Sequence, residues 1–169
     1  TDLDVNTLQA FVADPHGQAR SLLAKTTSRI IYDLNCFSRA RQPPFAAVLV
    51  RETHINGSLS SRTDKIQIYF TYSDGFGRAI QTKKMAEAGD APQRQVPVTL
   101  PSGDLKPGLL VHGIDGDLVQ IDVPLRWIGT GRTVYNKKGK PVRQYEPFFS
   151  VTHMYEDEAE MTDTGVSSI

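Results

Sequence analysis

Two short turn sequences constrain the fold of this chain more than any other feature. Segment 74–78 reads Asp-Gly-Phe-Gly-Arg, and segment 136–140 reads Asn-Lys-Lys-Gly-Lys. Asp or Asn folds back onto backbone amides, glycine accepts a positive φ, and the following cation begins the return strand. Both segments therefore predict β-hairpins. The residues assigned to them are Tyr72, Asp74, Gly77 and Arg78 in the first turn, and Tyr135, Asn136, Gly139 and Lys140 in the second.

The sequence from Thr26 onward favours antiparallel strands, because β-branched and aromatic residues recur in short runs broken by Gly, Pro, Asn and Asp. Ile66, Ile68 and Phe70 alternate with polar or amphipathic residues, which predicts one buried face and one wet face. The predicted fold class is mainly β. Strands are expected at residues 28–33, 46–54, 65–72, 78–85, 118–122, 125–135, 141–145 and 149–155.

Three parts of the chain are expected to differ in structure. Residues 1–25 form an N-terminal extension with one short helix, because Asp14 is a suitable N-cap, Pro15 suits the first helical position, and good helix formers continue to Lys25. Residues 26–155 form the β-hairpin segment, interrupted at 86–116 by a proline-rich excursion. Residues 156–169 contain little to bury and are expected to form a flexible tail.

Composition excludes several classes of function. Lys plus Arg and Asp plus Glu are both 19, so the formal net charge is zero and a general attraction to nucleic acid has no basis. No apolar stretch approaches the ~20 residues that cross a bilayer, so direct membrane insertion is not expected. The single cysteine, Cys36, rules out an internal disulfide framework and a cysteine-rich zinc site.

The two turns resemble the tyrosine-aspartate repeat, Tyr-Asp-x-x-Gly-Arg, of the Rhs superfamily. A third, degenerate copy opens at Tyr32, but Cys36 and Phe37 stand where Gly and Arg would be. A wider likeness is to the B component of tripartite insecticidal toxin complexes, in the stretch between its β-propeller and its later repeats. The stretches that carry this likeness are 27–34, 50–54, 65–78, 126–131 and 136–150.

The resemblance implies structural work within a secreted toxin. The B component joins a C component in a hollow β-shell that encloses the toxic C-terminal region of the C component, and its propeller docks on the pore-forming A component. The chain would be one non-catalytic piece of that shell, in contact with the remainder of the B component. Gly77 and Gly139 would set its bends, and Trp127 and Phe148 would anchor its packing.

Other groups of residues in the sequence are candidates for a different function. Five aromatic residues form the basis of the alternative function, a carbohydrate or host-surface binding β module, although the inward face of a sheet explains them better. An enzyme ranks last, because no nucleophile, base and oxyanion set follows from the spacings. The basic residues of segment 137–143 are interpreted as a solvated hairpin tip, and no metal or cofactor site is predicted. The aromatic residues are Trp127, Tyr145, Phe148, Phe149 and Tyr155, and the candidate nucleophile is Cys36 with one of His16, His54, His112 or His153.

Overall fold

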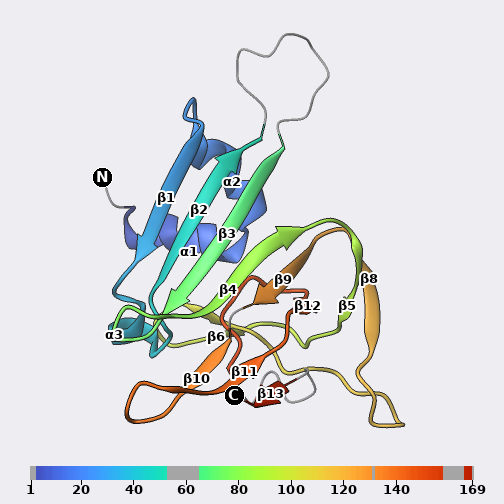
Figure 1. Ribbon diagram of the computed structural model, residues 1–169. Coiled ribbons are helices and arrows are strands. Elements are labelled where there is room, and N and C mark those ends of the chain that lie inside the picture. Colours follow the sequence, from blue (N-terminus) through green and yellow to red (C-terminus); the bar gives the residue numbers. More distant parts are fainter. Residues whose placement is uncertain (1–2, 53–64, 131, 158–165, 169) are drawn as a thin grey trace.

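The computed structural model describes residues 3–52, 65–130 and 132–157 and the backbone of 166–168 (Figure 1). The helices in these residues are α1 (Val5–Ala13), α2 (Pro15–Leu23) and α3 (Cys36–Ala40). Most other elements are antiparallel strands, so the predicted fold class is confirmed. The strands are β1 (Ser28–Asp33), β2 (Phe45–Arg51), β3 (Ile66–Ser73), β4 (Ala79–Ala86), β5 (Gly89–Pro92), β6 (Val98–Thr99), β7 (Leu105–Lys106), β8 (Gln120–Val123), β9 (Arg126–Thr130), β10 (Thr133–Tyr135), β11 (Pro141–Tyr145), β12 (Phe148–Ser150) and β13 (Val166–Ser168).

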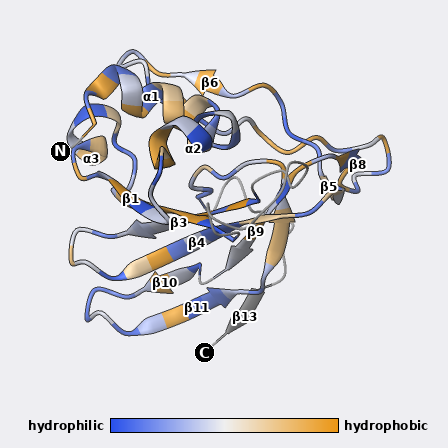
Figure 2. Ribbon diagram, turned by 90° about the horizontal axis from the view of Figure 1, so that it is seen from above, coloured by the Kyte–Doolittle hydropathy of each residue, from blue (hydrophilic) through white to orange (hydrophobic). Residues whose placement is uncertain are grey.

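The centre of the fold is a six-stranded sheet in the order β1-β2-β3-β4-β9-β12, with every neighbouring pair antiparallel. The predicted alternation in β3 is confirmed, because Ile66, Ile68 and Phe70 are 8%, 0% and 1% exposed. Their face carries the hydrophobic core, into which α1 and α2 also pack. The three-stranded sheet β10-β11-β13 lies on the side of the large sheet away from these helices (Figure 2).

The predicted N-terminal helix is present as α2, with Pro15 in its first turn and the Asp14 carboxylate accepting a hydrogen bond from the Gly17 N–H (2.9 Å). The prediction of one short helix is wrong in number, because α1 and α3 are also helical. Helix α1 begins after Asp4, whose carboxylate accepts from the Thr7 N–H (3.0 Å), and it buries Leu8 against the sheet. No helix in the described part of the chain is long and apolar enough to span a membrane.

The proline-rich excursion at 86–116 forms short strand pairs and packs back onto the helices. Strand β5 pairs with β8, and β6 pairs with β7 in a small hairpin. The Gln9 amide of α1 donates to the Ser102 carbonyl (3.1 Å). Arg39 of α3 donates to both oxygens of Asp104 at 2.7 and 2.8 Å, while also pairing with Asp33 (2.6 Å). The excursion is therefore tied to helical residues far from it in sequence.

Three of the predicted strands differ from the structure by more than two residues. The expected strand 125–135 is two strands, because β9 pairs within the large sheet whereas β10 pairs with β11 in another sheet. The expected strand 149–155 ends at Ser150. The expected strand 46–54 ends at Arg51, and its last two residues, Thr53 and His54, lie outside the described residues.

The predicted flexible tail at 156–169 stays a prediction, but residues near both of its ends contact the rest of the fold. Glu156, its first residue, is fully buried. Near the other end, β13 pairs with β11. We call residues 151–157, which follow β12, the strap.

Candidate functional site: two docked hairpin turns and a buried strap

The first predicted turn joins β3 to β4. Oδ1 of Asp74 accepts hydrogen bonds from the backbone N–H groups of Phe76 (2.8 Å) and Arg78 (3.0 Å). Gly77 has φ +77°, and its N–H donates to the Asp74 carbonyl (3.1 Å). Arg78 also holds the Asp74 carboxylate through its guanidinium (2.6 Å). Burial raises the pKa of Asp74, but these hydrogen bonds and the Arg78 charge outweigh it and leave the pKa below its usual value.

The second turn, between β10 and β11, repeats this geometry with Asn in place of Asp. Oδ1 of Asn136 accepts from the N–H groups of Lys138 (2.9 Å) and Lys140 (3.0 Å). Gly139 has φ +73°, and its N–H donates to the Asn136 carbonyl (2.9 Å). A positive φ at this position is what glycine permits and other residues resist. The two turns are therefore equivalent, atom for atom, in their backbone hydrogen bonding.

Arg78 docks the first turn on the second. Its guanidinium carbon lies 4.1 Å from the centre of the Tyr135 ring. Its Nη1 donates a long hydrogen bond to the Gly139 carbonyl (3.4 Å), and a Cβ at Gly139 would lie 3.0 Å from this nitrogen. The assigned cation of one turn thus stacks on the assigned tyrosine of the next, which joins two hairpins from different sheets.

The two predicted packing anchors lie in the large sheet. Trp127 is 3% exposed and packs edge-on to Phe70 (5.8 Å between ring centres). Phe148 lies across Gly129, its partner on β9, where an added Cβ would stand 2.3 Å from the ring. Gly129 is therefore needed for this close approach.

The strap crosses the same face of the sheet as the helices. The buried Tyr72 hydroxyl donates to the His153 carbonyl (3.0 Å). The His153 ring packs at a tilt against Phe70 and Trp127, with ring centres 4.8 and 5.3 Å apart. Burial, and secondarily the charge of Lys83, lowers the pKa of His153 to about 3, so the ring is neutral near pH 7. The same burial raises the pKa of Tyr72 well above its usual value.

A buried polar network fastens the end of the strap. The Glu156 carboxylate pairs with Lys83 and with Nη2 of Arg94 (2.5 Å), and it accepts from Ser150 Oγ (2.8 Å). The Gln81 side chain bonds both the N–H and the carbonyl of Glu156, at 2.9 and 3.1 Å. Sequence reasoning did not find this network, since its members come from β4, the excursion, β12 and the strap, and no local pattern links them.

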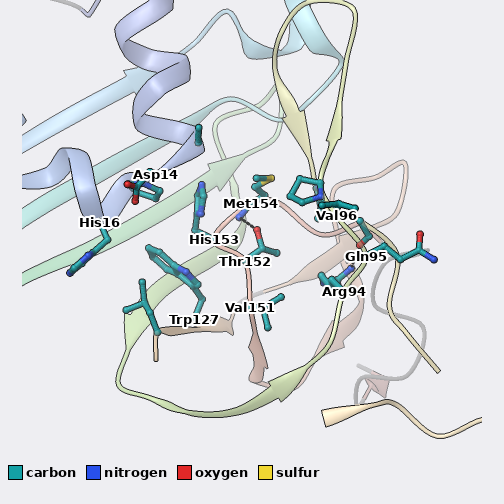
Figure 3. Close-up of a pocket in the computed structure, with 16 residues that line it drawn as sticks. Asp14, His16, Arg94, Gln95, Val96, Trp127, Val151, Thr152, His153 and Met154 are labelled. Atoms are coloured by element: carbon teal, nitrogen blue, oxygen red, sulfur yellow. Dashed lines mark hydrogen bonds between the residues drawn. The ribbon is translucent and has the colours of Figure 1, made fainter. Parts of the chain in front are cut away.

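A cavity of about 420 Å³ lies between the start of α2, the excursion and the strap (Figure 3). His16 and His153 line it, together with Asp14 and Arg94. Asp14 is engaged as the cap of α2, and Arg94 is engaged by Glu156 and the Gly108 carbonyl (2.8 Å). Its charged groups are therefore occupied in holding the fold together.

Cys36 lies away from this cavity, in a smaller hollow of about 30 Å³ that it shares with Asp33 and Asp104. Burial, followed by the charges of these two carboxylates, raises the pKa of the Cys36 thiol to about 12. The thiol is therefore protonated near pH 7, which opposes a nucleophilic role because the thiolate is the reactive form.

The remaining candidates are also spread over the fold. His112 sits in an isolated bridge with Leu118, and His54 lies outside the described residues. Among the described residues, no three metal-binding side chains come together. Of the aromatic group, Trp127 and Tyr145 are 3% and 4% exposed and offer no face for a sugar to stack on.

These features define an antiparallel β segment built from docked hairpins, and solved structures identify what it resembles. A crystal structure of TcdB2-TccC3 matches 81% of this chain at 27% identity, with a TM-score of 0.59. The Photorhabdus luminescens Tc holotoxin pore, with a mutant TccC3, matches 73% at 29% identity, with a TM-score of 0.54. The resemblance to a Tc toxin component that the sequence predicts is therefore confirmed over most of the chain.

The chain spans a small part of these proteins. It covers 6% of the matched TcdB2-TccC3 chain and 5% of the matched chain in the holotoxin pore. No protein-family model matches the sequence, and no curated protein matches it. The chain is thus similar to one segment of a far longer polypeptide.

Proposed function

We propose that this chain is a non-catalytic structural segment of a toxin-complex B component. It helps to form a hollow shell that encloses the toxic C-terminal region of the C component for delivery. Its partners are the remainder of the B component, the C component and the pore-forming A component, and it is secreted with them. Residues 26–155 are the shell segment of this proposal, flanked by the extension at 1–25 and by residues 156–169.

The docking of one turn on the next is the observation that carries the proposal. A wall must join successive hairpins without leaving gaps, and Arg78 joins two hairpins by stacking on Tyr135. The buried charged side chains also support a structural role, because Glu156 and Lys83 form an ion pair with each other inside the fold. Similarity to a segment of TcdB2-TccC3 supplies the context in which such a wall is useful.

The experiment is a chimera of TcdB2-TccC3 in which this chain replaces the matched segment. We expect the chimera to assemble and to protect its enclosed region from added protease. Gly77→Val should abolish protection, because valine resists a φ of +77°. Gly75→Val is the matched control, since Gly75 lies in the same turn without a positive φ and with open space around it.

The outcomes separate the proposal from its rivals. A chimera that assembles but leaves the enclosed region open to protease would contradict the proposal that this chain forms part of the shell wall. Equal protection in both valine variants would contradict the role of the turn. Selective retention of the isolated chain on immobilised glycans would instead favour the alternative of a carbohydrate or host-surface binding module.

A further inference from the structure

Two hollows share the β3–β4 turn as a common wall: the first is lined mostly by apolar side chains, with Arg41 and Asp74 also in its lining, and the second contains lysines. We call the first the apolar hollow; it has a volume of about 610 Å³, and its lining includes Leu34, Phe37, Pro43, Pro44, Ile80 and Tyr155. We call the second the basic hollow; it has a volume of about 420 Å³, and it is lined by Phe76, Arg78, Asn136, Lys137, Lys138 and Gly139. Residues 73–75 border the first, and residues 76 and 78 border the second.

The apolar hollow exposes side chains that a folded protein usually buries. Leu34 is 73% exposed and Phe37 is 55% exposed, and both border the same concave surface. Phe76, on the shared turn, is 86% exposed. Contiguous apolar surface around a hollow is typical of a site that another polypeptide covers.

The basic hollow carries an excess of positive charge. Within the described part of the chain, Lys137 and Lys138 take part in no ion pair, and neither does the adjacent Lys140. Arg78 is neutralised by Asp74 (2.6 Å). The local charge is therefore set by exposed lysines at one hairpin tip, although the whole chain is neutral.

We propose that the two hollows together bind an extended, partly acidic polypeptide segment. Its apolar side chains would fill the apolar hollow, its chain would cross the β3–β4 turn beside Phe76, and its carboxylates would meet Lys137 and Lys138. A nucleic acid fits less well, because the cations occupy one turn instead of a long stripe and an apolar surface lies next to them. This inference is independent of the shell proposal, since it concerns what this surface recognises.

The test uses the 169-residue chain and a fluorescently labelled peptide in which a leucine–phenylalanine stretch precedes a run of glutamates. We expect saturable binding by fluorescence anisotropy that weakens as salt is raised. A peptide with glutamine in place of glutamate, and one with serine in place of the apolar stretch, should each bind about tenfold more weakly, which is about 1.4 kcal/mol. Equal binding of all three peptides would overturn the proposal.

Variants map the binding to the two hollows. Lys138→Glu should weaken binding about tenfold, whereas Lys25→Glu, at an exposed site between α2 and β1, should not. Phe37→Ser should weaken binding similarly, whereas Ile114→Ser should not, because Ile114 is exposed elsewhere. Unchanged binding in both hollow variants would overturn the proposal, as would tighter binding of single-stranded DNA than of the peptide, or self-association that displaces the peptide.

Discussion

Glu156→Gln is the substitution that most directly tests how the strap is held. It keeps the shape of the side chain and removes one negative charge. The carboxylate is fully buried and faces Lys83 and Arg94, whose side chains are 0% and 5% exposed. After the change, two buried cations face a neutral amide, and neither can reach water without opening the strap.

The expected cost follows from that geometry. Removing one partner of a buried ion pair costs about 3–5 kcal/mol, because the remaining charge stays desolvated. For a chain of this size, that loss lowers the melting temperature by roughly 6–20 °C. The neighbouring Asp157→Asn is the control, since Asp157 and Lys106 are 41% and 37% exposed and 3.5 Å apart. A surface pair of this kind contributes about 0–1 kcal/mol.

The assay is urea unfolding followed by the fluorescence of Trp127, the single tryptophan, which packs against His153 of the strap. The free energy of unfolding should fall by at least about 3 kcal/mol in Glu156→Gln and by less than about 1 kcal/mol in Asp157→Asn. If both variants unfold at the same urea concentration, the buried network does not hold the strap and the reasoning fails.

Three further predictions test other parts of the fold. Gly77→Val should cost about 1–3 kcal/mol of unfolding free energy in the isolated chain, through strain at a positive φ, whereas Gly75→Val should be nearly neutral; calorimetry that ranks them equally would contradict the turn geometry. Gly129→Ala should lower the melting temperature measurably, because its Cβ would stand 2.3 Å from Phe148; an unchanged melting curve would show that the ring moves freely. His153 has a pKa of about 3 when folded and 6.5 as its ordinary value, so the unfolded chain takes up a proton first as pH falls. Its contribution to stability is therefore present above pH 6.5 and lost as pH drops toward 3, by about 2 kcal/mol between pH 7 and 5. His153→Leu should remove that slope, and a slope unchanged in this variant would refute the assignment.

Local patterns were enough to predict the turns and much of the central sheet. Strand β1 has the predicted bounds, 28–33, and β3 differs by one residue at each end. These elements follow from alternation and turn chemistry, which act between residues close in sequence. The docking of the turns did not follow, because the contact of Arg78 with Tyr135 depends on how two different sheets lie in space.

The first helix was missed although its sequence carries a signal. Asp4 precedes Thr7 at the spacing of an N-cap and its partner, and Leu8 and Phe11 lie on one helical face and are buried. The strand-like composition of the rest of the chain and the strong start signal at Pro15 of α2 favour the prediction of a single helix. A short amphipathic segment ahead of a stronger start signal is therefore easily left out.

The strap shows why a β-rich pattern need not give a strand. Residues 149–155 have strand-like composition, yet the pairing of β12 with β9 ends at Ser150. Beyond that point, side chains make hydrogen bonds with the backbone. The Gln81 amide bonds both the N–H and the carbonyl of Glu156, and the Thr152 hydroxyl accepts from the Met154 N–H (3.1 Å). A side chain that takes the place of a neighbouring strand lets the chain turn toward the core and carry a carboxylate with it. That buried carboxylate gives the strap one position on the sheet, since moving the strap would separate Glu156 from Lys83.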